Sequence, residues 1–195
     1  VHAAGIMISD RPLVEYTPLR KLNDGSLATQ YPHSSLEEIG LLKMDFLGLI
    51  NLSILARAVK LIQKTRNETV DVWDIPLDYS HPDAKKAYDM LGRGETTGVF
   101  QLESAGMKKY VVELKPNSVK ELSAMVALYR PGPLAHIPRY IRSKFDSTQI
   151  TYAHDLVKPI LEETYGVIVY QDQVLKIVQA VGGLSLGQAD LLRRA

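Results

Sequence analysis

Hydrophobic and polar residues change their spacing near residue 50 of this chain. Before that point, apolar residues gather in short runs typical of strands, AAGIMIS at residues 3–9 and LLKMDFLGL at residues 41–49. Between the two runs, the Asp24-Gly25 pair in NDGS is the signal of a hairpin turn, and SLATQY after it reads as extended chain. The first part of the chain is therefore expected to belong to a β-sheet.

Beyond residue 50 the helical period dominates. In NLSILARAVKLIQKT, apolar residues fall at positions 52, 54, 55, 58, 59, 61 and 62, and Ser53 is placed to cap the helix. Further helices are predicted after Pro82, in SAGMKKYVVEL, in NSVKELSAMVALY, in DQVLKIVQAV and in SLGQADLLRRA. The last of these opens with Ser185 and Gln188 in the spacing of a capping box. TTGVFQLES and TYGVIVYQ read as short strands.

These patterns predict an α+β fold. Residues 1–52 would hold the sheet, and residues 53–195 would form a mainly helical domain with short strands. Both ends of the chain fall inside a predicted element, because VHAAGIMIS reads as the middle of a strand and ADLLRRA stops within a helix. We therefore expect the chain to be a piece of a longer protein.

Composition narrows the class of protein without naming an activity. The 195 residues are 46% hydrophobic and 23% charged, which is ordinary for a globular protein. There is no cysteine, which excludes disulfides and thiolate metal sites and fits a reducing cytoplasm. No apolar run approaches the roughly 18 residues that a membrane span needs, and the N-terminus lacks a signal-peptide pattern. We expect a cytoplasmic protein with no membrane partner.

Charge is spread unevenly although the net charge is only +1. Residues 105–195 hold 12 Lys or Arg against 8 Asp or Glu, a net of +4, and the first 104 residues hold the remaining 11 against 14, a net of −3. The basic bias of the C-terminal part is a weak indication of an anionic partner.

One aspartate, Asp45, interrupts the apolar run LLKMDFLGL. Strand alternation places Lys43 and Asp45 on one face. The opposite face, which we expect to be core, carries Leu42, Met44 and Phe46. Because an unpaired carboxylate in apolar surroundings is costly, Asp45 needs a partner. There are three alternatives. Asp45 forms an ion pair with Lys43 or caps a backbone N–H, it binds a Mg²⁺ ion, or it acts as a general base. No second carboxylate stands two residues away, so further metal ligands would come from elsewhere.

Three arginines are candidates for phosphate contact. Arg193 and Arg194 lie in the last predicted helix, where they are either two exposed surface charges or bidentate ligands of phosphate oxygens. Arg130 stands immediately before Pro131-Gly132-Pro133, where a helix has to stop. There it either satisfies the last helix carbonyls or reaches a ligand.

A further basic stretch, IPRYIRSKF, interleaves Arg139, Arg142 and Lys144 with Tyr140 and Phe145. Such a stretch is able to follow a phosphate backbone while its rings stack on bases. An amphipathic surface segment is the alternative, and the pattern favours it slightly.

Six segments occur in order along nearly the whole chain: VHAAGIMIS, LLKMDFLGL, TTGVFQLES, ALYRPGP, TYGVIVYQDQV and LGQADLLRRA. Together they resemble the alpha subunit of bacterial DNA polymerase III, the C family of replicative polymerases. The resemblance implies that residues 1–52 are the second part of a nucleotidyltransferase-type palm and that residues 53–195 are a truncated fingers domain.

The resemblance also implies roles for the candidate residues. In the family, the aspartate of the strand matching LLKMDFLGL is the third catalytic carboxylate, so Asp45 would hold Mg²⁺ with two aspartates of an Asp-x-Asp motif that this sequence lacks. Arg193 and Arg194 would face the triphosphate of the incoming nucleotide. Arg130 would lie near the active cleft and touch nucleotide or template. Arg139, Arg142 and Lys144 remain tentative DNA contacts.

The implied function is template-directed transfer of a deoxynucleotide from a dNTP to a primer 3′-hydroxyl, with release of pyrophosphate, in bacterial replication. The implied partners are primer-template DNA, dNTPs, and, through regions outside this chain, the sliding clamp and other replisome proteins. The chain alone is expected to be inactive and to expose apolar surface. A non-enzymatic helical module that binds nucleic acid or protein is the alternative, and a Mg²⁺-dependent phosphohydrolase is disfavoured because no other carboxylates or histidines cluster.

Two further segments carry weaker expectations. Tyr170, Gln171 and Gln173 would help to shape a nucleotide pocket, or else Asp172 caps the following helix. The family reads Tyr-Gln-Glu-Gln there, so the aspartate keeps the charge. His2 is expected to be a core or hydrogen-bonding residue rather than a catalytic one.

Overall fold

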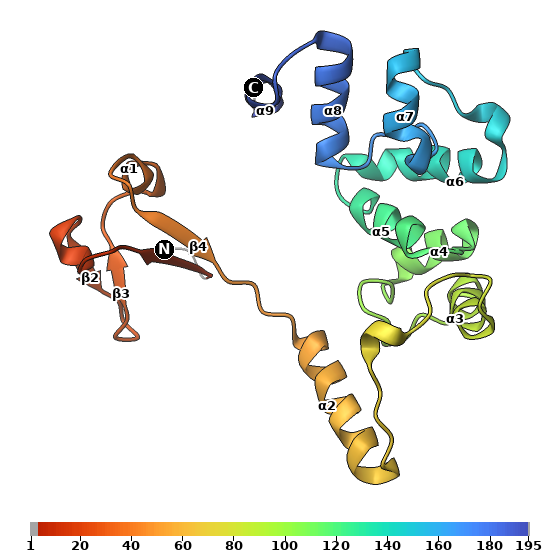
Figure 1. Ribbon diagram of the computed structural model, residues 1–195, viewed down its shortest axis with the longest axis horizontal. Helices are drawn as coiled ribbons and strands as arrows, with labels where there is room; N and C mark the ends of the chain where they lie inside the picture. Colours follow the sequence, from red (N-terminus) through yellow and green to blue (C-terminus); the bar gives the residue numbers. More distant parts are fainter. Residues whose placement is uncertain (1–3, 195) are drawn as a thin grey trace. The chain divides into compact units, whose positions relative to one another are not determined.

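The structure is a computed structural model in which residues 4–194 are described, so the expectation for His2 lies outside the described residues. The chain separates into two compact units, an N-terminal unit (residues 1–70) and a C-terminal unit (residues 71–195), coloured red to orange and yellow to blue in Figure 1. Within the described range, the strands lie in the N-terminal unit and the C-terminal unit is helical. The predicted α+β class is confirmed. Between residues 4 and 194, no helix is both long enough and apolar enough to cross a bilayer.

The first sheet pairs two strands that are far apart in the sequence. Strand β1 (Gly5–Ile8) runs antiparallel to β4 (Leu42–Asp45), with Gly5 opposite Asp45 and Ile8 opposite Leu42. The backbone N–H of Phe46 donates to the carbonyl of Ala4 at 2.8 Å, so the ladder continues past the end of β4. The two predicted apolar strands are therefore partners.

The predicted hairpin is present. Strands β2 (Leu19–Lys21) and β3 (Leu27–Thr29) pair antiparallel across the NDGS turn. In that turn the backbone N–H of Ser26 donates to the Asp24 carboxylate at 3.0 Å, and Gly25 adopts a φ of 86°. A 3-10 turn (Leu13–Glu15) precedes the hairpin, and a short helix α1 (His33–Glu38) that the sequence pattern missed follows it.

One prediction for the sheet is wrong in this chain: the face expected to be core is exposed. The exposed apolar side chains of this face belong to Ile6, Ile8, Leu42, Met44 and Phe46, with exposures between 41% and 58%. The hairpin and α1 lie on the opposite face, where they enclose a hollow of about 620 Å³ with Met7 and Lys43. A face of a two-stranded sheet is buried only when another element covers it. Here the hairpin and α1 cover the face with Met7 and Lys43, so the apolar face stays exposed.

Helix α2 (Ile50–Arg66) confirms the predicted helical period but not its predicted cap. Ser53 lies inside the helix, whose N-cap position is Leu49 without a side-chain hydrogen bond. The helix ends at Asn67 in the left-handed conformation, with a φ of 53°. None of its residues is buried.

The C-terminal unit is built from helices. Its longer helices are α3 (Pro82–Gly92), α4 (Ala105–Leu114), α5 (Val119–Leu128), α6 (Ile137–Phe145), α8 (Gln171–Gly182) and α9 (Leu186–Arg194). Short helical turns join them, namely α7 (Lys158–Leu161) and the 3-10 turns Val72–Asp74, Pro133–His136, Ser147–Gln149, Asp155–Val157 and Glu162–Thr164.

Several of these helices begin at side-chain caps. Ser104 and Ser118 cap α4 and α5. The predicted capping box of α9 is confirmed, because the N–H of Ser185 donates to the Gln188 side chain at 2.9 Å and the N–H of Gln188 donates to the Ser185 hydroxyl at 3.4 Å. Helix α8 ends at Gly182, and the glycine that follows it, Gly183, adopts the left-handed conformation with a φ of 65°.

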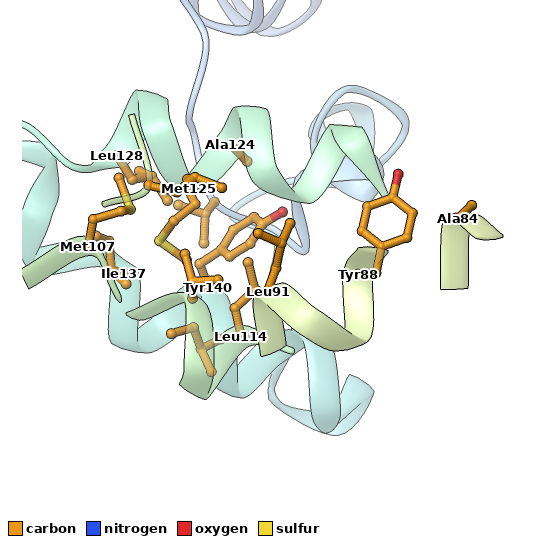
Figure 2. Packing of buried hydrophobic residues seen from close by; sticks show 14 residues of the cluster. Ala84, Tyr88, Leu91, Met107, Leu114, Ala124, Met125, Leu128, Ile137 and Tyr140 are labelled. Carbon is orange, nitrogen blue, oxygen red and sulfur yellow. The ribbon is translucent and has the colours of Figure 1, made fainter. Parts of the chain in front are cut away.

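A hydrophobic core joins helices α3 to α6 of this unit (Figure 2). Met107, Val111 and Leu114 repeat at helical spacing on one face of α4 and are at most 2% exposed. Met125 of α5 and Ile137 of α6 meet them with no exposed surface. The other buried members of the core are Ala84, Tyr88, Leu91, Leu102, Ala124, Leu128, Tyr140, Ile141 and Val167.

The two short strands predicted in the helical part are wrong. TTGVFQLES forms turns, with Gly98 at a φ of 75° and Gln101 at 62°. TYGVIVYQ also turns, with Tyr165 at 53° and Gly166 at 78°. Left-handed residues interrupt an extended ladder, so neither apolar run becomes a strand.

Candidate functional site

Asp45 ends strand β4 and is held there by the sheet. The residue directly opposite is Gly5, which has no side chain to cover the carboxylate. The Asp45 side chain is 57% exposed, and the ammonium of Lys43 lies 3.0 Å from its Oδ1 and 3.2 Å from its Oδ2. The ion pair weighed from the sequence is therefore present. It leaves much of the carboxylate open to solvent.

Asp45 alone does not make a metal site. In the described part of the chain, no group of three or more His, Cys, Asp or Glu side chains is placed to hold a metal ion. Mg²⁺ commonly takes one or two protein carboxylates together with phosphate oxygens and waters. One open carboxylate fixed at a strand end suits one such ligand, and further ligands have to come from other groups.

Arg193 and Arg194 lie together at the end of α9 and share one carboxylate. The Nη2 of Arg193 is 2.8 Å from Oδ1 of Asp190, and the Nη2 of Arg194 is 2.8 Å from Oδ2. The hydrogen bond from Arg193 is the main reason that the pKa of Asp190 lies below its ordinary value. Ala189, with no exposed surface, anchors the helix. The result is a cluster of two guanidinium groups and one carboxylate with a net charge of +1.

Arg130 follows the last residue of α5 in a tight turn. Its N–H donates to the carbonyl of Leu128 at 2.8 Å, its carbonyl accepts from Leu134 at 3.1 Å, and Gly132 turns the chain at a φ of 96°. The Arg130 side chain is exposed and makes no hydrogen bond or ion pair with any residue in the range 4–194. Its guanidinium group therefore does not satisfy the last helix carbonyls, although its backbone N–H reaches one of them.

The three basic residues of α6 have different surroundings. Arg139 donates to the carbonyl and hydroxyl of Thr151 at 3.3 and 3.1 Å and to the carbonyl of Gly166 at 3.4 Å, so it ties two loops to the helix. Arg142 is exposed and has no polar partner among the described residues. Tyr140 is 1% exposed in the core, which excludes it from stacking on a base, and its burial raises its pKa.

Lys144 is buried, with only 8% of its side chain exposed. Its ammonium donates to the carbonyls of Leu114 and Lys115 at 3.0 and 2.8 Å and to Oε2 of Glu121 at 2.8 Å. These three bonds use all the donors of an ammonium group, so none is left for a phosphate. This geometry gives Lys144 a structural role.

The segment before α8 is organised by Gln173. Its Oε1 accepts from the N–H groups of Val169 and Tyr170 at 2.8 and 3.0 Å, and its Nε2 donates to the Thr164 hydroxyl at 2.9 Å. Asp172 does not cap the helix, because it pairs with Lys176 at 2.7 Å. That pair lowers the pKa of Asp172.

Sequence reasoning missed two acidic residues of these sites, Asp190 and Glu121. For Asp190, the helical spacing to Arg193 and Arg194 was a usable signal. For Glu121, the spacing Ser118-x-x-Glu121 indicates a capping box, but nothing local indicates a partner 23 residues away.

Comparison with known proteins gives one consistent result. The family model described as the bacterial DNA polymerase III alpha subunit finger domain matches residues 51–195. The model described as the bacterial DNA polymerase III alpha NTPase domain matches residues 1–48.

Several curated relatives match along 100% of this chain, each bearing the name DNA polymerase III subunit alpha. The one from Halalkalibacterium halodurans is 49% identical, and those from Bacillus subtilis and Staphylococcus aureus are 46% and 45% identical. The chain spans only 17 to 18% of the length of these relatives.

Proposed function

This chain belongs to the bacterial DNA polymerase III alpha subunit family, and we propose that it serves as part of a template-directed DNA polymerase in bacterial replication. The reaction is transfer of a deoxynucleotide from a dNTP to a primer 3′-hydroxyl, with release of pyrophosphate. The observation that carries the proposal is the identity of 45 to 49% over the whole chain, across both matched domains.

We assign residues 1–52 to the second part of the palm and residues 53–195 to the fingers. The boundary falls close to the point where one family model ends, at residue 48, and the other begins, at residue 51. The contact between strands β1 and β4 supports a palm element in the first segment, because it holds a carboxylate at a strand end.

Asp45 is proposed as one carboxylate ligand of Mg²⁺, with the other ligands supplied outside this chain. When bound, the metal would polarise the primer hydroxyl and stabilise the charge of the triphosphate. This chain would contribute by holding the carboxylate in place through the hydrogen bonds between β1 and β4. Lys43 balances its charge while the site is without metal, since its ammonium contacts both carboxylate oxygens.

Arg193, Arg194 and Arg130 are proposed to bind nucleotide phosphates. The first two present paired guanidinium groups, which suit bidentate contact with phosphate oxygens. A triphosphate would replace the Asp190 carboxylate as their partner. The Arg130 side chain makes no hydrogen bond or ion pair within the described residues, which supports its role.

Among the basic residues of α6, Arg142 is the one proposed to contact the DNA backbone. It is exposed, whereas Arg139 and Lys144 are bound to internal carbonyls. The proposed partners are primer-template DNA and dNTPs in the cytoplasm. The sliding clamp and other replisome proteins would bind through regions outside this chain.

The test is Asp45→Ala in the full-length polymerase. We expect primer extension to fall by at least about a thousandfold, as for loss of a metal-binding carboxylate, while affinity for primer-template DNA stays within a few fold. Asp74→Ala removes an exposed carboxylate of similar size and serves as the matched control. Primer extension at the parental rate by Asp45→Ala would refute the proposal.

A second measurement uses the chain of 195 residues by itself. Because it offers one of the proposed metal ligands, we expect no primer extension from the purified chain with Mg²⁺ and dNTPs. If primer-extension activity co-purified with the chain, the assignment of the other metal ligands to regions outside the chain would be wrong.

A further inference from the structure

A buried ion pair joins three helices of the C-terminal unit. Glu121 of α5 is 4% exposed and Lys144 of α6 is 8% exposed, and their charged groups are 2.8 Å apart. Lys144 also holds the last carbonyls of α4 at Leu114 and Lys115. Helices α4, α5 and α6 are therefore fixed at one point by charge as well as by the apolar core.

The same pair continues towards α8. The Tyr165 hydroxyl donates to Oε1 of Glu121 at 2.7 Å, and this tyrosine is held in the left-handed conformation with a φ of 53°. Its neighbour Thr164, 1% exposed, accepts a hydrogen bond from Gln173 at 2.9 Å. Gln173 in turn binds the backbone N–H groups at the start of α8. We call Glu121, Lys144, Tyr165, Thr164 and Gln173 the buried polar network.

This network connects the elements that carry the proposed nucleotide contacts. Helix α5 leads directly into Arg130, and α8 packs against α9, which ends in Arg193 and Arg194. The network links the N-terminal turn of α5 to the N-terminal turn of α8 through side-chain hydrogen bonds and the peptide bond between Thr164 and Tyr165.

Stability is a weak explanation for a buried ion pair. Removing two charges from water costs about as much as their attraction returns, so apolar replacements are often as stable or more stable. What an ion pair with full hydrogen bonding does supply is a fixed geometry, since each of its bonds has a preferred length and direction. Each of the three donors of Lys144 and both oxygens of Glu121 are used in this way.

We propose that Glu121 and Lys144 are positioning residues that fix α8 and α9 relative to α5, and so set the placement of Arg193 and Arg194 for the triphosphate. This inference rests on the proposed function of those arginines. It predicts that loss of the ion pair weakens nucleotide binding in a variant that remains folded.

The experiment removes both charges together in the full-length polymerase. In the variant Glu121→Gln with Lys144→Met, no unpaired charge is left in the core, and the glutamine still accepts from Tyr165. We expect the KM for dNTP to rise about tenfold, equivalent to about 1.4 kcal/mol of binding, with kcat and DNA affinity within about threefold of the parent. The melting temperature should fall, because the carbonyls of Leu114 and Lys115 and the N–H of Asn117 lose their side-chain partners, but the variant should remain folded at the assay temperature.

An exposed ion pair provides the matched control. Lys120 and Glu163 join α5 to the same turn that holds Thr164, at 3.3 Å, but their side chains are 73% and 56% exposed. The variant Lys120→Met with Glu163→Gln should leave the KM for dNTP unchanged. A folded Glu121→Gln, Lys144→Met variant with parental KM would overturn the proposal, and so would an equal rise in KM in the control.

Two further variants make every outcome decisive. If the double variant fails to fold, Tyr165→Phe, which removes one hydrogen bond and no charge, decides the question by raising the KM or leaving it at the parental value. Replacing Arg193 and Arg194 by Ala tests the proposed function separately. A rise in KM in that variant but not in the network variants would refute only the positioning role.

Discussion

The two units of the chain use their apolar residues in opposite ways. In the C-terminal unit, helices α3 to α6 enclose a continuous core whose central residues, such as Leu114 and Met125, have no exposed surface. In the N-terminal unit, strands β1 and β4 share an apolar face that the sequence predicts to be core. This face is exposed, with Ile8 at 44% and Leu42 at 58%. Helix α2 has no buried residue.

The difference shows that an apolar pattern reports the need for a partner, not the identity of that partner. The C-terminal unit finds partners within the chain for α3 to α6, whose apolar faces meet in the core. The strands β1 and β4 pair with each other along one edge, but two strands do not bury a sheet face. We expect folding stability to reside mainly in the C-terminal unit.

The largest effect is predicted for Leu114→Ala in the chain of 195 residues. Leu114 has no exposed surface and lies in the centre of the core (Figure 2), so the change should lower the free energy of unfolding by about 2–5 kcal/mol. Leu42→Ala, at a position 58% exposed, should cost less than about 1 kcal/mol. Chemical denaturation followed by circular dichroism measures both.

Equal losses in the two variants would break the comparison. They would mean that the face of β1 and β4 is buried in solution as thoroughly as the helical core, for example between two copies of the chain.

A smaller effect is predicted for self-association through that face. Large exposed apolar patches promote association, so the purified chain is expected to form oligomers as its concentration rises. Ile8→Lys puts a charge in the patch and should weaken association roughly tenfold to a hundredfold, the equivalent of about 1.5–3 kcal/mol for one buried side chain. Sedimentation velocity at several concentrations measures this change.

Val14→Lys is the control for that experiment. Val14 is 69% exposed but lies in the 3-10 turn outside the sheet face, so its replacement should leave association unchanged. A chain that stays monomeric at every concentration would contradict the prediction.

Local signals in the sequence predicted most of the fold. The helical period of α2, the Asp24-Gly25 hairpin, and the Ser185 and Gln188 capping box are each determined by residues within a turn or two of one another, and each is present. Ser53 failed as a cap because the helix starts three residues earlier, at Ile50. Two apolar runs failed as strands because Gln101 and Tyr165 adopt left-handed backbone conformations that composition does not reveal. The glycine in each run, Gly98 and Gly166, was a usable turn signal.

The candidate site was less predictable because its decisive contacts are distant in sequence. Lys144 looked like a surface cation, but its partner Glu121 is 23 residues away, and Glu121 meets Tyr165 over 44 residues. Arg139 reaches Gly166 over 27 residues. The amphipathic spacing of α6 does not distinguish Arg139 and Lys144, which bind other segments of the chain, from Arg142, which is exposed and has no polar partner among the described residues. The assignments of Asp45, Arg130, Arg193 and Arg194 as site residues remain predictions.

The smallest effect concerns the exposed ion pairs of α9, which sharpen the contrast with the buried pair of Glu121 and Lys144. The hydrogen bond from Arg193 keeps the pKa of Asp190 below its ordinary value. A carboxyl group with a lowered pKa in the folded state stabilises that state above its unfolded pKa of about 3.9, and this contribution is lost as the pH falls through the folded pKa. Because the Asp190 carboxyl is partly exposed to solvent and its partners are on the same helix, we expect only slight fraying of α9 below that pH.

Carbon-detected NMR titration of the Asp190 carboxyl measures this effect directly. Arg193→Ala should raise the pKa of Asp190 towards its ordinary value, since it removes the hydrogen bond that contributes most to the shift. Arg142→Ala removes an exposed arginine of α6 that does not contact Asp190 and should leave that pKa unchanged. If Arg193→Ala also left it unchanged, the two guanidinium groups would not be gathered by this carboxylate in solution. The triphosphate would then meet two independent arginines, and fixing the position of α9 would matter less for its binding.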